Sequence, residues 1–189
     1  MDVDMEATGA RPGGADSRDR VLEAQGISEP STASCLLAVD VGNTVTKFGV
    51  FAADELAGTW EVTTSERCTA DEAWAQAACA IDMLGAPEPK SAILSCVVPS
   101  LAEVWRSALG KLCGARPYAV GPGLKTGIRM RYDDPSEVGS DRVADAVAAR
   151  ETYGAPVVVV DLGTTTNIEV VDESGAFAGG IIAPGVALG

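Results

Sequence analysis

Short apolar runs that end in an acidic residue alternate along this chain with longer amphipathic segments. The run CLLAVD (35–40) is followed by the turn GNT and a second run, VTKFGVF (45–51), which predicts a strand, a tight turn and a partner strand. Further strands are predicted at SAILSCVV (91–98), at PYAV (117–120) and at PVVVVD (156–161), the last as a buried strand that ends in Asp.

Three segments between these runs have apolar residues at helical spacing. A capping box formed by Thr69 and Glu72 precedes the first segment, whose helix is expected to end near the Gly-Ala-Pro that begins at residue 85. Ser100 is expected to cap the second helix. The third, SDRVADAVAARETYG (140–154), is expected to begin at its first or second residue.

The opening hairpin is repeated near the C-terminus. LLAVDVGNTVTKFGVF (36–51) can be placed over VVVVDLGTTTNIEVVD (157–172) without a gap. The identical pairs are Val39 with Val160, Asp40 with Asp161, Gly42 with Gly163, Thr44 with Thr165, and Val50 with Val171. The repeated unit consists of a strand, a D-x-G-[NT]-T turn and a second strand. Two copies of this unit in one chain predict two related halves that face each other.

Each repeated turn has the residue types that suit a phosphate group. The backbone N–H groups of such a turn can bind phosphate oxygens, and the carboxylate at the end of the strand suits a hydrated Mg²⁺ ion. Glycine at Gly42 and Gly163 would let the backbone come close to the ligand. The small side chains able to donate further hydrogen bonds are Asn43, Thr44, Thr164 and Thr165. A single copy is more typical of an ordinary hairpin in which Asp40 caps the turn and glycine supplies a positive φ, but the presence of two copies reverses that preference and favours phosphate binding.

Composition and charge exclude several classes of function. The 189 residues include 14 Lys and Arg against 27 Asp and Glu, a net charge of −13 that would repel nucleic acid and anionic membranes, so neither partner is expected. The absence of His excludes His triads and leaves acid–base chemistry to carboxylates.

Five Cys without a C-x-x-C pair indicate reduced thiols and a cytoplasmic location. No apolar run approaches the roughly 18 residues that span a bilayer.

The paired turns DVGNT (40–44) and DLGTTT (161–166) resemble the two phosphate loops of acetate and sugar kinases, actin and the heat-shock chaperone ATPases. The segment GPGLKTGIRMRYDDPSEVGSDRVADAVAA (121–149) resembles type III pantothenate kinases more specifically. The resemblance implies an α/β fold with two ribonuclease-H-like halves and ATP in the cleft between them. We expect residues 1–34 to be a disordered leader, 35–152 to be the first half with the Gly-rich loop, and 153–189 to begin a second half that is incomplete.

The same resemblance implies ATP-dependent phosphorylation of pantothenate to 4′-phosphopantothenate, the first step of coenzyme A synthesis, in a homodimer whose site lies near the subunit contact. It implies ATP, Mg²⁺ and a monovalent cation, K⁺ or NH₄⁺. The implied ATP-binding residues are Asp40, Val41, Gly42, Asn43, Thr44, Val45, Thr46, Lys47 and Thr164. The implied pantothenate contacts are Tyr132, Gly139, Ser140, Asp141 and Arg142. Asp141 is the implied catalytic base, while Asp40 would lie near Mg²⁺ through water and Asp161 would bind the monovalent cation.

Several of these residues have ordinary structural explanations as well. Asp141 is a chemically adequate proton acceptor, but Asp at the start of an amphipathic helix is also a common N-cap. Tyr132 could equally be a packed aromatic at a strand end. Three loop cations suit an anionic substrate or are simply solvated: Lys125, Arg129 and Arg131.

The sequence departs from the family pattern at three places. Ser140 stands where the family usually has Ala, and Asn167 and Glu169 stand where Thr and Asp are commoner. The chain stops at IIAPGVALG (181–189), where family members continue, so we expect a truncated product that exposes apolar strand faces and is unstable or inactive alone. The alternative functions are a nucleotide- or pantothenate-sensing regulator without catalysis and a kinase for another small hydroxy acid or sugar.

Overall fold

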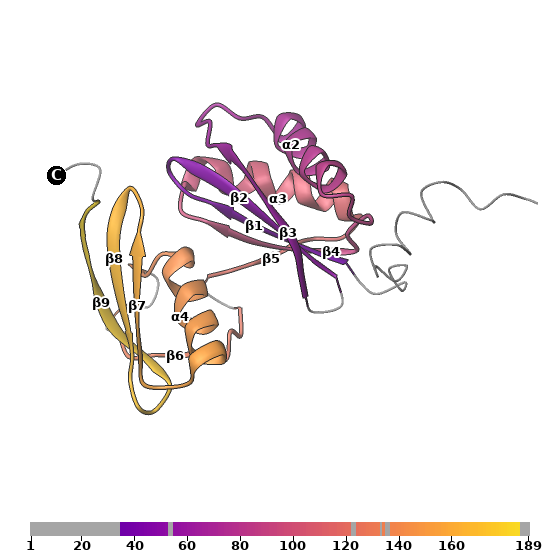
Figure 1. The fold of residues 1–189 in the computed structure, drawn as a ribbon. Coiled ribbons are helices and arrows are strands. Elements are labelled where there is room, and N and C mark those ends of the chain that lie inside the picture. The colour runs from indigo at the N-terminus through magenta and orange to yellow at the C-terminus, as the bar shows by residue number, and fades with distance from the viewer. Residues whose placement is uncertain (1–34, 53–54, 122–123, 133, 135–136, 186–189) are drawn as a thin grey trace, which may run out of the picture. The chain divides into compact units, whose positions relative to one another are not determined.

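A computed structural model describes residues 35–52, 55–121, 124–132, 134 and 137–185. In these residues the strands form a five-stranded and a four-stranded sheet, accompanied by helices (Figure 1). The predicted leader, residues 1–34, lies outside the described residues, and a domain division at residue 152 stays a prediction. None of the described helices has the length and apolar character needed to cross a bilayer. The five cysteines, all within the described residues, are free thiols as predicted.

The first sheet is built around the opening hairpin. Its central strand β1 (Cys35–Val41) is antiparallel to β2 (Val45–Ala52) and parallel to β4 (Ser91–Cys96). Outside these lie β3 (Glu55–Thr63), antiparallel to β2, and β5 (Tyr118–Ala119), parallel to β4. The sheet order is β3-β2-β1-β4-β5. The strands predicted in this half are confirmed as β1, β2, β4 and β5, whereas β3 was not predicted.

Helix α2 (Ala70–Met83) begins at the predicted capping box. The Glu72 N–H donates to Thr69 Oγ1 at 3.3 Å, and the Thr69 N–H donates to Glu72 Oε2 at 2.8 Å. Two N–H groups that lack a partner within the helix are thereby satisfied. This local rule is sufficient to fix the start of α2.

Helix α3 (Pro99–Cys113) starts two residues earlier than the predicted cap requires, since a cap at Ser100 would make Leu101 the first helical residue. Its N-cap is Val98, which makes no side-chain capping bond, and Pro99 follows at the start of the helix. Proline suits that position because its φ is already helical and its missing N–H would have no partner. Ser100 therefore lies within the first turn, and the prediction that it caps α3 is wrong.

Helices α2 and α3 cover one face of the first sheet (Figure 1). The residues of β1 on that face are almost inaccessible: Leu37 at 0%, Val39 at 2% and Val41 at 0% exposure. Successive side chains of a strand point to opposite faces, so Asp40 is carried on the other face of the sheet. The burial of its neighbours thus fixes the direction of this carboxylate.

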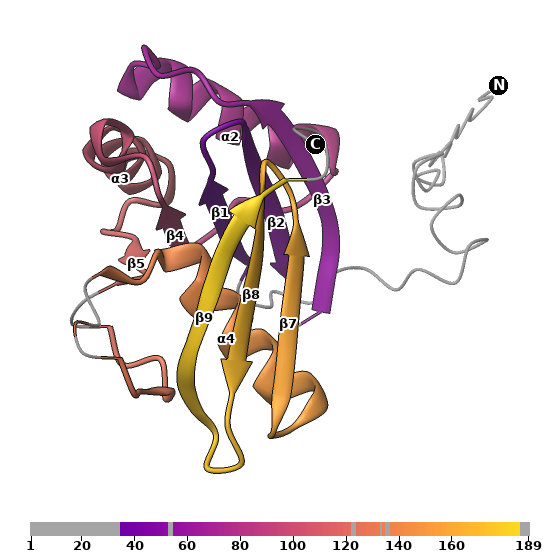
Figure 2. The same ribbon diagram turned by 90° about the vertical axis from the view of Figure 1, so that its left-hand side faces the viewer.

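The second sheet is formed by β7 (Val157–Leu162), β8 (Thr165–Val171) and β9 (Ala176–Pro184), which are successively antiparallel. The short strand β6 (Arg129–Met130) adds to β9 in parallel, giving the order β6-β9-β8-β7. Helix α4 (Ser140–Tyr153) packs on β7 and β8 and also contacts β4 of the first sheet (Figure 2). Its start at Ser140 agrees with the predicted one. The α/β fold with two sheets is therefore confirmed.

One face of β7 is open to solvent among the described residues. The exposed residues are Val158 at 58%, Val160 at 54% and Leu162 at 66%. Their counterparts in the first copy of the repeat are the inaccessible residues Leu37, Val39 and Val41. The difference arises because α2 and α3 cover that face of β1, whereas α4 packs on the opposite face of β7. The prediction of a buried strand is wrong here, and an exposed apolar face is present as expected.

The two hairpins differ by one residue in their turns. The strand pairs that close them are Val41 with Thr46 in the first hairpin and Leu162 with Thr166 in the second. Four residues separate the first pair and three separate the second. The gap-free alignment therefore holds only as far as the turn, and Val50 corresponds in space to Val170 rather than to Val171.

Candidate active site

The tips of the two repeated hairpins meet. Thr44 Oγ1 lies 2.9 Å from Thr164 Oγ1, a hydrogen bond between residues of the two sheets. The first tip is fixed to the end of β3, because Thr64 Oγ1 donates to the Gly42 carbonyl at 2.8 Å and the Thr64 N–H donates to the Thr44 carbonyl at 2.9 Å. The predicted arrangement of two facing turns is thus present.

Neither turn uses its glycine for a positive φ. Gly42 and Gly163 are not among the described glycines that have one. The Gly42 N–H donates to the Val45 carbonyl at 3.1 Å, and a Cβ on Gly42 would lie only 3.0 Å from that same oxygen. The ordinary-hairpin explanation of these glycines is therefore wrong, and close approach of backbone is the reason for glycine at position 42.

A cavity of about 690 Å³ lies where the hairpin tips meet β4 and α4. Four carboxylates line it: Asp40, Asp141, Asp145 and Asp161. Further along the first sheet its lining is mainly apolar: Ala38, Gly49, Phe51, Leu56 and Ile93. Such a cavity suits a small ligand with a charged group at one end and an uncharged body.

The charge of this cavity is strongly unbalanced. Among the described residues that line it, Lys47 is the one cation against four carboxylates. Phosphate groups would be repelled by that charge unless metal or other cations entered with them. A phosphate ligand here therefore requires bound cations.

Burial raises the pKa of two of these carboxylates. The pKa of Asp145 is raised to about 6, first by burial and then by the charges of Asp161 and Glu169. The pKa of Asp40 is also raised by burial, and a hydrogen bond from Ser95 opposes that effect. We did not predict Asp145 from the sequence. Its signal was the spacing of four residues from Asp141, which places both on one side of α4.

Asp141 lies in the first turn of α4 without capping it. The N-cap is Gly139, and no side chain makes a capping bond there. The Asp141 carboxylate accepts instead from the Arg142 N–H at 2.8 Å. A Cβ on Gly139 would collide with Asp141 Oδ1, so glycine makes room for this carboxylate. The N-cap explanation of Asp141 is therefore wrong.

Two serines connect the start of α4 to the first sheet. Ser140 Oγ lies 3.0 Å from Ser95 Oγ on β4 and accepts from the Cys96 N–H at 3.0 Å. Ser95 is directly opposite Asp40 in the parallel pairing of β4 with β1, and both line the cavity. Ser95 was not predicted, because only the strand register brings it beside Asp40.

A buried ion pair joins α4 to the second sheet. Arg142 Nε lies 2.7 Å from Glu169 Oε1, with side-chain exposures of 11% and 0%. The guanidinium also lies 5.9 Å from the ring centre of Phe177, and a Cβ on Gly180 would collide with it. Arg142 is thus enclosed on several sides, which restrains the helix that carries Asp141.

Comparison with known proteins assigns the family. The sequence profile of a family described as "Type III pantothenate kinase" matches residues 36–189. The chain belongs to the type III pantothenate kinase family. It is 41% identical over 155 residues to the type III pantothenate kinase of Moorella thermoacetica, covering 81% of this chain and 61% of that relative. The Rhodospirillum centenum enzyme is 46% identical over 156 residues, covering 81% and 60%. The chain thus spans about 60% of the length of these curated relatives.

A solved structure shows the same fold at low identity. The activator of the 2-hydroxyisocaproyl-CoA dehydratase from Clostridium difficile aligns with a TM-score of 0.50 and 8% identity, covering 79% of this chain and 46% of that one. This likeness agrees with the two-lobed α/β fold expected for the pantothenate kinase family.

The cavity brings together most residues that the family resemblance predicts as ligands. Those that line it are Asp40, Gly42, Asn43, Thr44, Val45, Lys47, Asp141, Asp161 and Thr164. The predicted residues outside its described lining are Val41, Thr46, Tyr132, Gly139, Ser140 and Arg142. Val41 and Thr46 point to the other face of the sheet because strand side chains alternate. The ligand roles of all these residues stay predictions.

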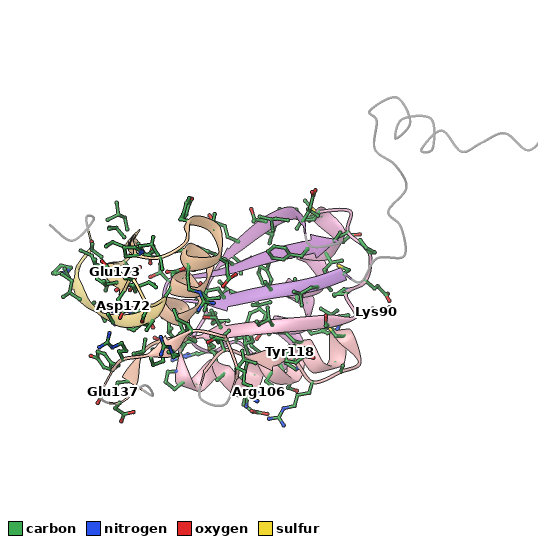
Figure 3. All side chains as sticks on the ribbon, turned by 90° about the horizontal axis from the view of Figure 1, so that it is seen from below. Lys90, Arg106, Tyr118, Glu137, Asp172 and Glu173 are labelled. Atoms are coloured by element: carbon green, nitrogen blue, oxygen red, sulfur yellow. The ribbon has the colours of Figure 1, made fainter. Side chains whose placement is uncertain are left out.

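The three loop cations lie away from the described lining of the cavity. Arg131 Nη1 is 2.7 Å from Asp172 Oδ2. Asp172 lies at the turn between β8 and β9 and is labelled in Figure 3. Hydrogen bonds from Ser174 and Arg131 lower the pKa of Asp172. Arg129 donates to the Ser174 carbonyl at 3.4 Å. These arginines therefore stabilise a turn of the second sheet.

The carboxylates of the cavity fit a hydrated cation better than a directly enclosed one. Among the described residues, no group of three or more acidic or Cys side chains is arranged to hold a metal directly. Asp40 Oδ1 is buried and has no hydrogen-bond partner, so one lone-pair site of this carboxylate is available. Mg²⁺ usually keeps several waters and contacts one or two carboxylates, which this arrangement fits.

Proposed function

We propose that the protein transfers the terminal phosphoryl group of ATP to pantothenate and forms 4′-phosphopantothenate, the first step of coenzyme A synthesis. The observation that carries this proposal is the meeting of Thr44 and Thr164 at a cavity that Asp141 also lines. Family membership supports the choice of substrate.

Asp141 is proposed as the base. Phosphoryl transfer needs a group that accepts the proton of the attacking hydroxyl, and no His is present to do so. Asp141 lines the cavity, and the backbone N–H of Arg142 holds its carboxylate in one orientation. The hydroxyl oxygen of pantothenate would attack the terminal phosphorus of ATP while Asp141 takes the hydroxyl proton. The bond from that phosphorus to the bridging oxygen would break, and ADP would leave with the bridging oxygen.

The two turns are proposed to hold the phosphates of ATP. In the first turn, backbone N–H groups and small side chains between Asp40 and Lys47 would donate to phosphate oxygens. Thr164 would donate from the second turn. Lys47 would contribute the positive charge that the protein itself brings to the phosphates.

Cations are proposed to balance the remaining charge. Asp40 would hold a hydrated Mg²⁺ and Asp161 a K⁺ or NH₄⁺ ion. When bound, these ions would neutralise phosphate charge and orient the transferred group. The excess of carboxylates in the cavity supports this requirement.

Pantothenate is proposed to contact Tyr132 and the segment from Gly139 to Arg142, in a homodimer. The enclosed position of Arg142 limits its part in this contact. Its Nε is already engaged by Glu169, so it would reach the substrate only through its terminal nitrogens.

The release of ADP tests the proposal. The protein is expressed from its complete coding sequence and incubated with ATP, Mg²⁺ and K⁺, with and without pantothenate and with a panel of other hydroxy acids and sugars. We expect ADP release that depends on pantothenate. Nucleotide binding without release would indicate a regulator, and equal release with another acceptor would indicate a different kinase; either result contradicts the proposal.

A further inference from the structure

Ser140, the first residue of α4, connects this helix to β4. Its hydroxyl accepts from the Cys96 N–H at 3.0 Å and lies 3.0 Å from Ser95 Oγ. An alanine at this position could make neither contact. The hydroxyl therefore adds a polar connection between α4 and β4.

A hydrogen bond of 3.0 Å, in which either hydroxyl could be the donor, joins Ser140 Oγ to Ser95 Oγ. A serine hydroxyl has one proton to donate, whereas a carboxylate can only accept. When Ser95 donates its proton to Asp40, its direct neighbour across the β1–β4 pairing, it can only accept from Ser140. Ser140 Oγ in turn accepts from the Cys96 N–H at 3.0 Å.

Ser95 and Asp40 are neighbours in the strand register and line the same cavity, and a hydrogen bond from Ser95 opposes the effect of burial on the pKa of Asp40. The sequence of donors thus runs from Cys96 through Ser140 and Ser95 to Asp40. Hydrogen bonds in such a chain polarise and strengthen one another in a low-dielectric interior. Ser95 is only 7% exposed, so water has little access to replace these partners.

We propose that Ser140 is a positioning residue that fixes the Ser95 hydroxyl as a donor to Asp40 and so holds this carboxylate for the cation of bound Mg-nucleotide. The inference rests on the proposed function. Because Ser140 is adjacent to Asp141 on α4, the same contacts tie the base-bearing turn to the cation-binding carboxylate.

The expected consequence of losing this hydroxyl is specific to the cation. In Ser140→Ala, the Cys96 N–H loses its acceptor and the Ser95 hydroxyl loses the donor that fixes its rotation. Asp40 would then be less well oriented for Mg²⁺, whereas the turns that contact phosphate would be intact. The effect should therefore appear in the Mg²⁺ dependence of nucleotide binding.

The test is a Mg²⁺ titration of ADP binding, followed by calorimetry, with the protein expressed from its complete coding sequence. We expect the half-saturating Mg²⁺ concentration to rise roughly fivefold in Ser140→Ala, as the loss of about one hydrogen bond implies. Ser140→Thr should restore it to within about twofold of the original. Ser100→Ala is the matched control, since Ser100 also lies in the first turn of a helix but outside the described lining of the cavity.

The outcomes separate the inference from the proposed function. If the unmodified protein fails to bind ADP with Mg²⁺, the proposed function fails. If it binds and Ser140→Ala has an unchanged Mg²⁺ midpoint, or loses binding equally at every Mg²⁺ concentration, the inference is overturned. If Ser140→Ala does not fold, Ser95→Ala takes its place and must show the same shift, because it removes the middle hydroxyl of the chain.

Discussion

The hydroxyls of Thr44 and Thr164 lie 2.9 Å apart although 120 positions separate them in the sequence. Each belongs to one copy of the repeated turn, so the repeat brings its two copies to one point. The carboxylates of Asp40 and Asp161, which end the preceding strands, line the same cavity. This juxtaposition makes the two hairpins parts of one site.

The Thr164 hydroxyl should contribute to nucleotide binding and little to stability. Thr164→Val removes the hydroxyl and keeps the shape, so ADP affinity should fall roughly fivefold while the free energy of unfolding changes by less than about 0.5 kcal/mol. Calorimetry and thermal unfolding measure the two effects. Thr166→Val is the control, because Thr166 Oγ1 donates to the Pro184 carbonyl at 3.2 Å on the same hairpin but lies outside the described lining. An equal loss of ADP affinity in Thr164→Val and Thr166→Val would contradict a specific role of the Thr164 hydroxyl in nucleotide binding.

Asp145 should make stability depend on pH. Its pKa is raised to about 6 from the ordinary value of 3.8, so the folded protein binds more protons than the unfolded chain between these pH values. Stability should therefore fall as pH rises through that window. Asp145→Asn removes the charge and should stabilise the cation-free protein by about 1 kcal/mol at pH 7.5 after allowance for solvent screening.

Thermal unfolding at two pH values measures this effect. At pH 4 the Asp145→Asn variant should have no advantage over the original protein, because most Asp145 carboxyls are already neutral when folded. An equal gain at pH 4 and pH 7.5 would show that something other than the charge of Asp145 is responsible.

The Arg142–Glu169 pair should be important for stability. Glu169→Ala leaves a buried guanidinium without its partner and should cost about 3–5 kcal/mol of unfolding free energy. Glu169→Gln keeps the shape and an acceptor oxygen, so its cost should be smaller. The comparison is Asp71→Asn, which removes the exposed Lys111–Asp71 pair at 2.9 Å and should cost less than about 1 kcal/mol. Similar values for the two pairs, from urea unfolding, would show that burial is not decisive here.

The two copies of the repeat should respond differently to the same substitution. Val39 lies in the core and is only 2% exposed. Val39→Thr places a hydroxyl there, so we expect the free energy of unfolding to fall by about 1–3 kcal/mol. Val160→Thr, at the equivalent position with 54% exposure, should change stability by less than about 0.5 kcal/mol. Urea unfolding of the chain of residues 1–189 tests both. A large loss in Val160→Thr would mean that this face of β7 is covered.

Local patterns predicted much of the fold. The capping box at Thr69, the opening hairpin and the start of α4 at Ser140 follow from rules that act over a few residues. The cap of α3 was wrongly placed because Pro99 satisfies the first turn in a different way from Ser100. The burial of β7 was wrongly predicted because apolar composition does not say which helix covers a strand.

The parts of the site that lie in the repeated turns could be predicted from the sequence. The parts that only tertiary contacts bring together could not. The turns around Thr44 and Thr164 carry a sequence signature. Asp145 and Ser95 do not, because their importance depends on burial and on the register of β4 against β1. The difference in turn length between the two hairpins could not be predicted either. The identical residues before the turn align in the same way whether or not one turn is a residue shorter.

Asp141→Asn tests the central claim most directly. The variant keeps the size of the side chain and an acceptor for the Arg142 N–H but removes the proton acceptor. With the protein expressed from its complete coding sequence, pantothenate-dependent ADP release should fall by at least about 100-fold while the affinity for ADP and Mg²⁺ stays within about threefold. Unchanged release would show that Asp141 is not the base and would contradict the assignment of this cavity as the place of phosphoryl transfer.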